Sequence, residues 1–336
     1  METQHNPKLV STELANLWTQ YMGDSMSVCM LKYMLKKVED DDIRSILEFS
    51  LSLSKRHLER IKEFFHEEKY PIPYGFTDED VNLEAPRLFS DNLFLKYIHI
   101  MAAHGLTGYA VAFTTSVRSD VRKYYADCNV ESMELFNQSL DLLLSKGLYT
   151  RPPYLHPPEM AQYVKKQGFL TGWFGNRRPL NGIEISNIIF NMNKMVLGKA
   201  MVLGFSQVAQ SQDVREYFMR GSQLSSKHIE IFSSLLHEDN LPSPPPWDDE
   251  VTNSTVAPFS DKLMTFHTGF YTQTAVAFYG AAIAVCMRRD LATQYVRMTS
   301  EMEQYGEDGA NILINNGWME QPPTADDRVS LASGKK

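Results

Sequence analysis

Two histidines are the side chains of this sequence best suited to chemistry, and they occupy the same place in a segment that occurs twice. The stretches LSKRHLERIKEFFHEEKYPIP (53–73) and LSSKHIEIFSSLLHEDNLPSP (224–244) agree at 8 of 21 positions. His57 and His228 correspond, and each falls on the apolar face of its segment when residues are placed about 100° apart, as in a helix. The second histidine of each stretch, nine residues later, falls on the opposite face. We therefore expect His57 and His228 to lie in the protein interior.

Metal binding is one chemistry that an interior histidine can perform. Asp24, His104 and Glu131 are expected at about the level of His57, each from a different predicted helix. Histidine and carboxylate side chains near the midplane of a helical bundle hold the iron or manganese ions of ferritin-like proteins. Asp24, His57, His104 and Glu131 are therefore the candidate metal ligands of this chain.

Two features of the sequence oppose a metal centre. Ferritin-like centres use Glu-x-x-His on two helices, and the motif Glu63–His66 faces outward. In the second copy, the positions of Asp24, His104 and Glu131 are taken by Met195, Thr274 and Glu301. We therefore favour neutral core histidines bonded to neighbouring hydroxyl groups, with Ser132 as the partner of His57, and predict no cofactor. Iron or manganese in the first copy is the alternative.

A pocket for an apolar ligand between helices is a third interpretation. Its lining residues would be Met101, Tyr109 and Phe136 in the first copy, and His228 and Tyr279 in the second. Packing with a bonded hydroxyl is the competing interpretation of the two tyrosines. The sequence contains no P-loop, G-x-S-x-G motif, dinucleotide-binding fingerprint or Cys-His nucleophile pair, so no catalytic residue is predicted.

The elements that must position these residues come in two copies. An offset of 171 residues aligns Glu13 with Glu184, and an offset of 170 aligns Phe89 with Phe259. Internal similarity at a fixed offset indicates a tandem duplication. Helical periodicity predicts four segments in the first copy, at 13–38, 43–69, 91–117 and 121–146.

The connections within a copy predict how its helices are arranged. Short turns join the first helix to the second and the third to the fourth, which makes each pair antiparallel. The second and third helices are joined by YPIPYGFTDEDVNLEAPRLF, twenty residues that are long enough to cross the bundle. Two hairpins linked by one long crossover is a ferritin-like connectivity. The sequence therefore predicts an all-α fold, a tandem duplication of a ferritin-like four-helix bundle.

Polar residues and glycines mark the expected helix ends. Gly147 and Gly317 are expected just after the last helix of each copy, where a left-handed backbone is wanted. Side chains that accept hydrogen bonds from free backbone amides are expected at the helix starts. These N-caps are Asp42, Ser90 and Asp120 in the first copy and Asp213, Ser260 and Asp290 in the second.

Four regions follow from this organisation. Residues 1–150 form the first bundle, 151–180 a linker rich in proline and aromatic residues, 181–325 the second bundle and 326–336 a disordered tail. Phe169, Trp173 and Phe174 of the linker are too apolar to be left in solvent, and we predict that they clasp the two bundles together.

Composition excludes several classes of protein. The net charge of −8 argues against nucleic-acid binding, which needs a basic face. The three cysteines match neither a disulfide framework nor a cysteine-rich metal motif, and the N-terminal residues contain no apolar signal segment. The uncharged stretch Gly269–Met287 is about long enough to span a bilayer, but its polar residues favour a buried helix of a soluble bundle.

Several stretches resemble a two-repeat family of endospore-forming bacteria. They include ELANLWTQYM, LSLSKRHLE, IPYGFTDEDVNLEAPRLFSD, GWFGNRRPLN, KHIEIFSSLLHED and PFSDKLMTFHT, and together they cover nearly the whole chain. The resemblance implies tandem ferritin-like bundles, and some members of the family are labelled as spore-coat-related.

We therefore expect a non-enzymatic structural or binding protein of sporulating bacteria, in the cytoplasm or in the spore coat assembled from it. Its partners would be proteins or further copies of itself, with no nucleic acid and no transmembrane segment. The alternative is a ferritin-like metal-dependent oxidoreductase or metal-binding protein that uses the core of the first bundle.

Overall fold

The computed structural model describes residues 7–173 and 177–334. Among these residues it contains helices and no strand, which confirms the all-α prediction. The long helices are α1 (Ser11–Lys37), α2 (Asp41–Glu67), α3 (Asp91–Thr114), α4 (Ser119–Ser145), α5 (Gly182–Val208), α6 (Gln212–Glu238), α7 (Asp261–Val285) and α8 (Arg289–Asn315). The short ones are η1 (Asp78–Asp80), η2 (Gln167–Leu170), η3 (Asp248–Glu250) and α9 (Arg328–Ala332).

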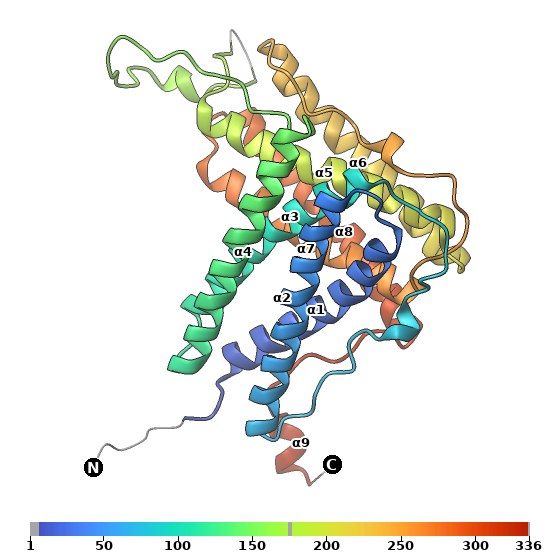
Figure 1. The fold of residues 1–336 in the computed structure, drawn as a ribbon. Coiled ribbons are helices and arrows are strands. Elements are labelled where there is room, and N and C mark those ends of the chain that lie inside the picture. Colours follow the sequence, from blue (N-terminus) through green and yellow to red (C-terminus); the bar gives the residue numbers. More distant parts are fainter. Residues whose placement is uncertain (1–6, 174–176, 335–336) are drawn as a thin grey trace.

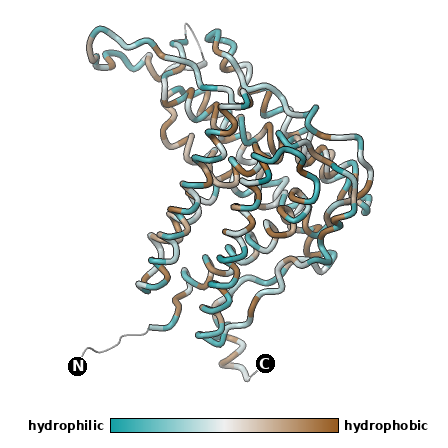
Figure 2. The backbone as a smooth tube through the Cα atoms, in the orientation of Figure 1, coloured by the Kyte–Doolittle hydropathy of each residue, from teal (hydrophilic) through white to brown (hydrophobic). Residues whose placement is uncertain are grey.

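The helices form two copies of one unit, as the duplication predicts (Figure 1). In the first, α1 packs along α2 and α3 along α4, and α2 contacts both helices of the second pair. In the other, α5 packs along α6 and α7 along α8, and the pairs meet through α5 with α7 and α6 with α8. Hydrophobic and hydrophilic residues alternate along these helices (Figure 2), so each helix can turn one face toward its neighbours.

The helix ends follow the sequence in part. Ser90 and Ser260 cap α3 and α7 as predicted, and Gly147 and Gly317 have the expected positive φ of 68°. The prediction was wrong for the aspartates, since Asp42, Asp120, Asp213 and Asp290 lie in the first turns of their helices rather than at the caps. The cap of α2 is Asp40, whose carboxylate accepts hydrogen bonds from the amides of Asp42 and Ile43.

The two crossovers hold the two halves together by pairing with each other. The amide of Asn82 donates to the carbonyl of Pro258 at 2.8 Å, and the amide of Thr252 donates to the carbonyl of Leu88 at 2.9 Å. At an offset of 170, residue 82 corresponds to residue 252 and residue 88 to residue 258. The first crossover therefore donates to the second at one end of this contact, and the second donates to the first at the equivalent positions. Short β-bridges between Val81 and Phe259 and between Phe89 and Val251 repeat this reciprocity. The halves are therefore related by an approximate twofold axis through the crossovers.

The linker does not join the bundles in the way the sequence suggested. Phe169 lies under the guanidinium of Arg178, at the start of the second copy. Trp173 is 54% exposed, and Phe174 lies outside the described residues. One hydrophobic core instead runs through both halves. For Phe169 and Trp173 the prediction was wrong, because aromatic content shows that a segment needs a neighbour but does not show which neighbour it has.

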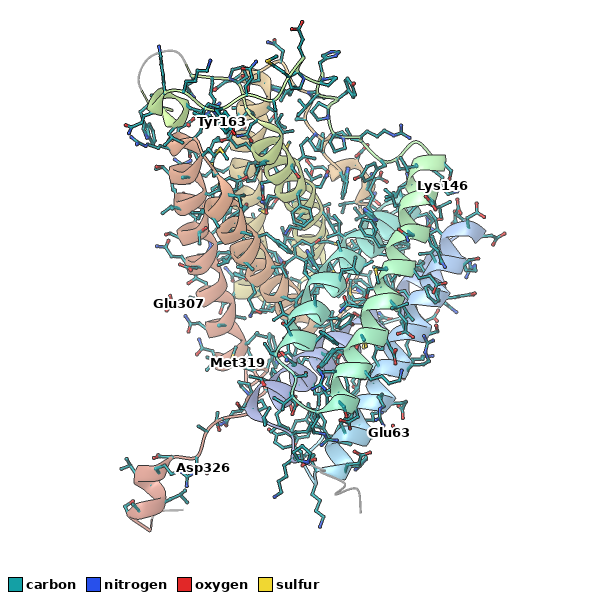
Figure 3. The ribbon with its side chains drawn as sticks, turned by 90° about the vertical axis from the view of Figure 1, so that its left-hand side faces the viewer. Glu63, Lys146, Tyr163, Glu307, Met319 and Asp326 are labelled. Atoms are coloured by element: carbon teal, nitrogen blue, oxygen red, sulfur yellow. The ribbon has the colours of Figure 1, made fainter. Side chains whose placement is uncertain are left out.

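Two apolar stretches could be mistaken for membrane helices. By length and composition α5 alone among the described helices passes that test, and 72% of its most apolar window is buried within the protein. The stretch that begins at Gly269 belongs to α7, which packs on α5 and α8. In the tail, the structure has the short helix α9 where the sequence predicted no structure, and Figure 3 shows it apart from both bundles.

Candidate functional site

A buried charged cluster lies in the first bundle around His57 of α2. Nε2 of His57 is 2.8 Å from Oε2 of Glu131 on α4, and its Nδ1 is 3.4 Å from Oδ2 of Asp24 on α1. His57 and Asp24 are both more than 90% buried. Because helical periodicity turns these three positions toward one another from separate helices, the structure brings together three of the four predicted metal ligands.

Cys128 completes this cluster. It lies on α4 one turn before Glu131, and its sulfur lies within 4.8 Å of the ligand atoms of His57 and Glu131. The amide of Gln20 donates to Asp24 at 3.2 Å, and Arg56 donates to the other oxygen of Glu131 at 2.7 Å. We call Asp24, His57, Cys128 and Glu131 the His57 cluster.

Several polar atoms around the His57 cluster have no hydrogen-bond partner. They are Oε1 of Gln20 and the hydroxyl groups of Tyr124 and Tyr125, whereas Nδ1 of His57 has its ion-pair contact with Asp24. Tyr109 and Tyr124 also turn their ring edges to the imidazole. An unpaired buried polar group costs about 1–3 kcal/mol, so a bound species that supplied the missing contacts would stabilise this cluster.

The carboxylates decide the charge of His57. Burial lowers the pKa of this histidine, but Asp24 and then Cys128 and Glu131 outweigh burial and raise the pKa to about 12. His57 is therefore an imidazolium at neutral pH. The expectation of a neutral histidine bonded to the Ser132 hydroxyl was wrong for this copy, because two carboxylates reach the ring.

The second copy holds its histidine differently. Nδ1 of His228 is 3.1 Å from the hydroxyl of Tyr279, and Nε2 is 3.0 Å from Glu301. Met195 and Met298 stand where the first copy has Asp24 and Cys128. Burial lowers the pKa of His228, and Glu301 opposes this shift without overcoming it. His228 is thus a neutral core histidine with a hydroxyl partner, as the sequence predicted for it.

His104 does not belong to the His57 cluster. Its ring stacks on Phe278 and meets the edge of Tyr271, both in the other half of the chain. Neither ring nitrogen has a hydrogen-bond partner, and burial lowers the pKa of His104 to about 3. The assignment of His104 to the side of His57 was wrong, because its face of α3 is turned to α7 of the second bundle.

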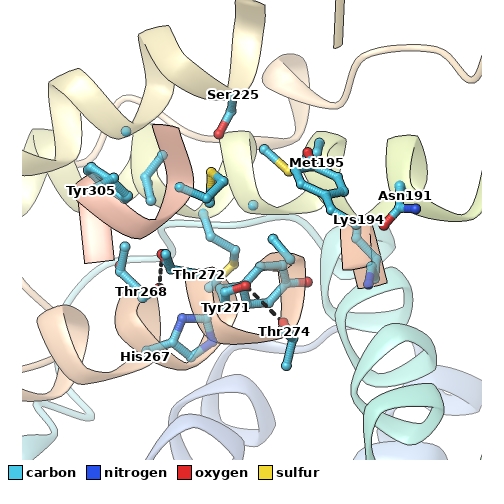
Figure 4. A pocket seen from close by; sticks show the side chains of 17 residues that line it. Asn191, Lys194, Met195, Ser225, His267, Thr268, Tyr271, Thr272, Thr274 and Tyr305 are labelled. Atoms are coloured by element: carbon cyan, nitrogen blue, oxygen red, sulfur yellow. Dashed lines mark hydrogen bonds between the residues drawn. The ribbon is translucent and has the colours of Figure 1, made fainter. Parts of the chain in front are cut away.

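The predicted pocket residues are also dispersed. Tyr109 lies beside the His57 cluster and Met101 packs against the main core. Phe136 lines a cavity of about 120 Å³ between the halves. Tyr279 lines a smaller cavity of about 30 Å³ (Figure 4), beside its bond to His228. None of these cavities gathers the three residues of the first copy, whereas His228 and Tyr279 of the second copy are neighbours.

Lys194 of α5 lies between the two smaller cavities and lines both. Its ammonium nitrogen is 3.2 Å from the ring centre of Phe278 and has no hydrogen-bond partner. Figure 4 shows the side chain at one end of the group of lining residues, apart from His267. Burial lowers the pKa of Lys194 to about 6, so the amine is mainly uncharged at neutral pH.

A groove of about 640 Å³ lies where the two halves meet. Its walls are α1, α7, α8 and the segment 318–322, in which Figure 3 labels Met319. Glu320 ties this segment to the first crossover by accepting hydrogen bonds from the amides of Tyr74 and Gly75 at 2.9 and 3.1 Å. Among its apolar lining residues are Trp18, Met22, Phe266, Phe270, Met302 and Trp318. We call this cavity the interbundle groove.

Sequence reasoning missed Cys128 and the interbundle groove. Cys128 has a local signal, since it stands three residues before Glu131 and so shares its helix face. The groove has no such signal. Its walls come from both ends of the chain, so it can be recognised only when the packing of the halves is known.

Comparison with known proteins identifies a family but no activity. The model of a family described as "Protein of unknown function (DUF3231)" matches residues 1–160 and 168–331. No curated protein matches. Among solved structures, a chain from Bacillus halodurans C-125 described as a putative spore coat protein is 18% identical, with a TM-score of 0.41. The similarity covers 45% of this chain and 98% of that one.

Proposed function

This chain belongs to the DUF3231 family of proteins of unknown function, and we propose that it is a binding protein that holds an elongated apolar small molecule in the interbundle groove. The observation that carries the proposal is the volume of about 640 Å³. Small-molecule sites are concave, mostly apolar and about 300–1,000 Å³ in size. The groove has the size and the lining of such a site.

The lining also supports a choice among apolar ligands. Within the described part of the chain no lysine, arginine or histidine lines the groove, whereas Glu303 and Glu320 do. A carboxylate or phosphate at one end of the ligand would therefore meet no cation and would face acidic side chains. We infer a neutral or cationic ligand rather than a fatty-acid anion.

Two glycines of α7 can each be replaced by a bulky side chain without a clash, one of them inside the groove and the other outside it. A Cβ added to Gly269 on α7 meets nothing within 4 Å, and the same is true of Gly280 on the same helix. Gly269 lines the groove and Gly280 is exposed outside it. Leucine is favoured over glycine in a helix by about 0.8 kcal/mol, so neither Gly269→Leu nor Gly280→Leu is expected to unfold the chain.

The test is binding of Nile red, a neutral apolar dye, to the purified chain and to these two variants. We expect saturable binding to the wild type and to Gly280→Leu, and at least tenfold weaker binding to Gly269→Leu. An anionic dye of similar size should bind more weakly than Nile red in all three. Equal Nile red affinity in Gly269→Leu and the wild type, or no saturable binding at all, would overturn the proposal.

We place this binding role in sporulating bacteria, in the cytoplasm or the spore coat, on the strength of the sequence resemblance alone. A fluorescent fusion followed through sporulation tests the location. A signal that stays dispersed in the mother cell and is absent from purified spores would rule out the coat. A role without catalysis is part of the proposal, and a turnover measured on any co-purified ligand would contradict it.

A further inference from the structure

We propose that the His57 cluster is a binding site for one divalent transition-metal ion of the zinc class, with Nε2 of His57, Sγ of Cys128 and the carboxylate of Glu131 as its ligands. The three ligand atoms all lie within 4.8 Å of one another. Zinc binds nitrogen and oxygen at about 2.0–2.2 Å and sulfur at about 2.3 Å, so two ligands of a tetrahedral ion lie roughly 3.3–3.8 Å apart. Adjustments of about 1 Å in side chains would therefore bring the three atoms around one ion. A metal ligand must be deprotonated, so the ion would displace the Nε2 proton of the His57 imidazolium and the thiol proton of Cys128, and both protons would pass to solvent.

Asp24 supports His57 from the other side of the ring. Its Oδ2 is 3.4 Å from Nδ1, while Nε2 is 2.8 Å from Glu131. A carboxylate that accepts the second N–H of a histidine fixes the ring orientation and makes the free nitrogen a better metal ligand. Asp24 is thus a positioning residue, which explains a buried acid on α1 at this level.

The surroundings provide for a fourth ligand. Three protein ligands leave one position of a tetrahedral ion open for water. The hydroxyl groups of Tyr124 and Tyr125, on buried side chains of α4, have no partner in the protein. Unpaired buried hydroxyl groups beside the cluster are a second observation that points to a bound species, since a water on the ion is one partner that they lack in the protein.

The set does not suit the two-metal centre of ferritin-like proteins. Such centres take a glutamate or Glu-x-x-His from each of four helices. Here α3 contributes the ring of Tyr109, and a thiol stands one turn from Glu131. Thiolate ligands select zinc and similar ions over manganese. The inference is therefore one ion rather than an iron or manganese pair.

The second bundle is a control built into the same chain. It keeps the histidine and the glutamate as His228 and Glu301, at 3.0 Å, but has Met298 and Met195 in place of the thiol and the orienting acid. We therefore expect one metal site per chain. Since Met298 fills the position in the second copy, Cys128→Met is expected to fold.

The experiment is titration of the untagged chain with Co²⁺, which reports its ligands by absorption. The wild type should bind one Co²⁺ per chain and develop a thiolate-to-cobalt charge-transfer band in the near ultraviolet. Cys128→Met should lose that band and bind at least tenfold more weakly, whereas Cys286→Ser, which removes a thiol elsewhere, should match the wild type. An unchanged band in Cys128→Met, or no Co²⁺ binding to the wild type, would overturn the site.

A second measurement decides the matter if Cys128→Met fails to fold. X-ray absorption of the zinc-loaded wild type should show one sulfur at about 2.3 Å among otherwise nitrogen and oxygen neighbours. A shell of nitrogen and oxygen alone would overturn the proposal. This result is independent of the interbundle groove, because none of the three ligands lines it.

Discussion

At the scale of single residues, one substitution separates the two buried histidines. Asp24 and Met195 occupy the same position, and the acid is the largest of the influences that raise the pKa of His57. His228 lacks that acid, and burial keeps its pKa low. Two copies of one element therefore hold the same imidazole in two charge states, which is how a duplicated scaffold can diverge in chemistry without changing its fold.

Lys194 gives a residue-scale prediction about pH. The unfolded chain keeps this amine protonated up to its ordinary pKa near 10.5, whereas the folded chain releases the proton above about 6. Between these values the unfolded state binds more protons, so the free energy of unfolding rises with pH in this window. We expect Lys194→Met to stabilise the protein by about 1–3 kcal/mol near neutral pH, because it removes an unpaired buried amine.

Urea unfolding near neutral pH and at about pH 9.5 checks this prediction. The gain from Lys194→Met should shrink at the higher pH, where the wild-type penalty is smaller. The control is Lys199→Met on the same helix, since Lys199 pairs with Asp248 at 2.6 Å and its removal should not stabilise the chain. A Lys194→Met variant that is less stable than the wild type at both pH values would contradict the assignment.

The sequence predicts which residues face the interior more reliably than it predicts which residues they contact there. The inward faces of His57 and His228 follow from a 3.6-residue period, and Asp24 and Glu131 were placed at the right level by counting from turns. His104 and Ser132 were assigned to His57 by the same counting and do not bond to it. The height of a residue along the bundle can be counted from the helix turns. The direction in which its side chain points also depends on how the helix is rotated about its axis, and that rotation is set by packing against the other half.

At the scale of elements, α6 and α8 approach closely through two reciprocal contacts. The rings of Tyr217 and Tyr305 stack with centroids 4.3 Å apart. The hydroxyl of Tyr217 lies over Gly309, and that of Tyr305 lies over Gly221, so a methyl group at either glycine would overlap a hydroxyl. The first copy has serines and aliphatic residues at these four positions, which shows that the stack is specific to the second bundle.

This pair of contacts gives an element-scale prediction. Gly309→Ala should destabilise the protein by about 1–3 kcal/mol through overpacking, although alanine is favoured over glycine in a helix by about 1 kcal/mol. Adding Tyr217→Phe, which removes the overlapping hydroxyl, should recover part of the loss. Gly280→Ala on α7 is the control and should stabilise the chain, since it meets open space. Thermal unfolding of the four proteins measures this, and a neutral Gly309→Ala would refute the close contact.

Local sequence signals predicted the helices more reliably than they predicted single contacts. The four helices of the first copy lie within a few residues of their predicted bounds, because amphipathic periodicity and turn residues act over short distances. The cap of α2 was misplaced because several acidic residues stand in a row at 39–42, and any of them can accept the free amides. Composition alone does not choose among adjacent acids.

At the scale of the whole molecule, the arrangement of the halves depends on contacts that sequence reasoning did not anticipate. The crossovers were predicted as connections within each bundle, yet they pair with each other across the approximate twofold axis. Side chains at this axis follow the same symmetry, since Nε2 of His267 is 3.1 Å from the hydroxyl of Tyr97, its counterpart at an offset of 170. The interbundle groove depends on this arrangement, because its walls come from both halves.

The last prediction concerns the linker, whose residue Tyr163 is 94% exposed. If the crossovers and the shared core hold the halves together, a protease site inserted beside Tyr163 can be cut without separating them. The cut chain should elute in gel filtration at the position of the intact chain, whereas two species of half the mass would contradict a shared core.

Phe259→Ala in the cut chain should make the halves separate on dilution, because a truncated buried phenylalanine costs about 3–5 kcal/mol. Since Phe259 pairs with Val81 across the axis, this variant distinguishes association through the crossovers from association through the linker.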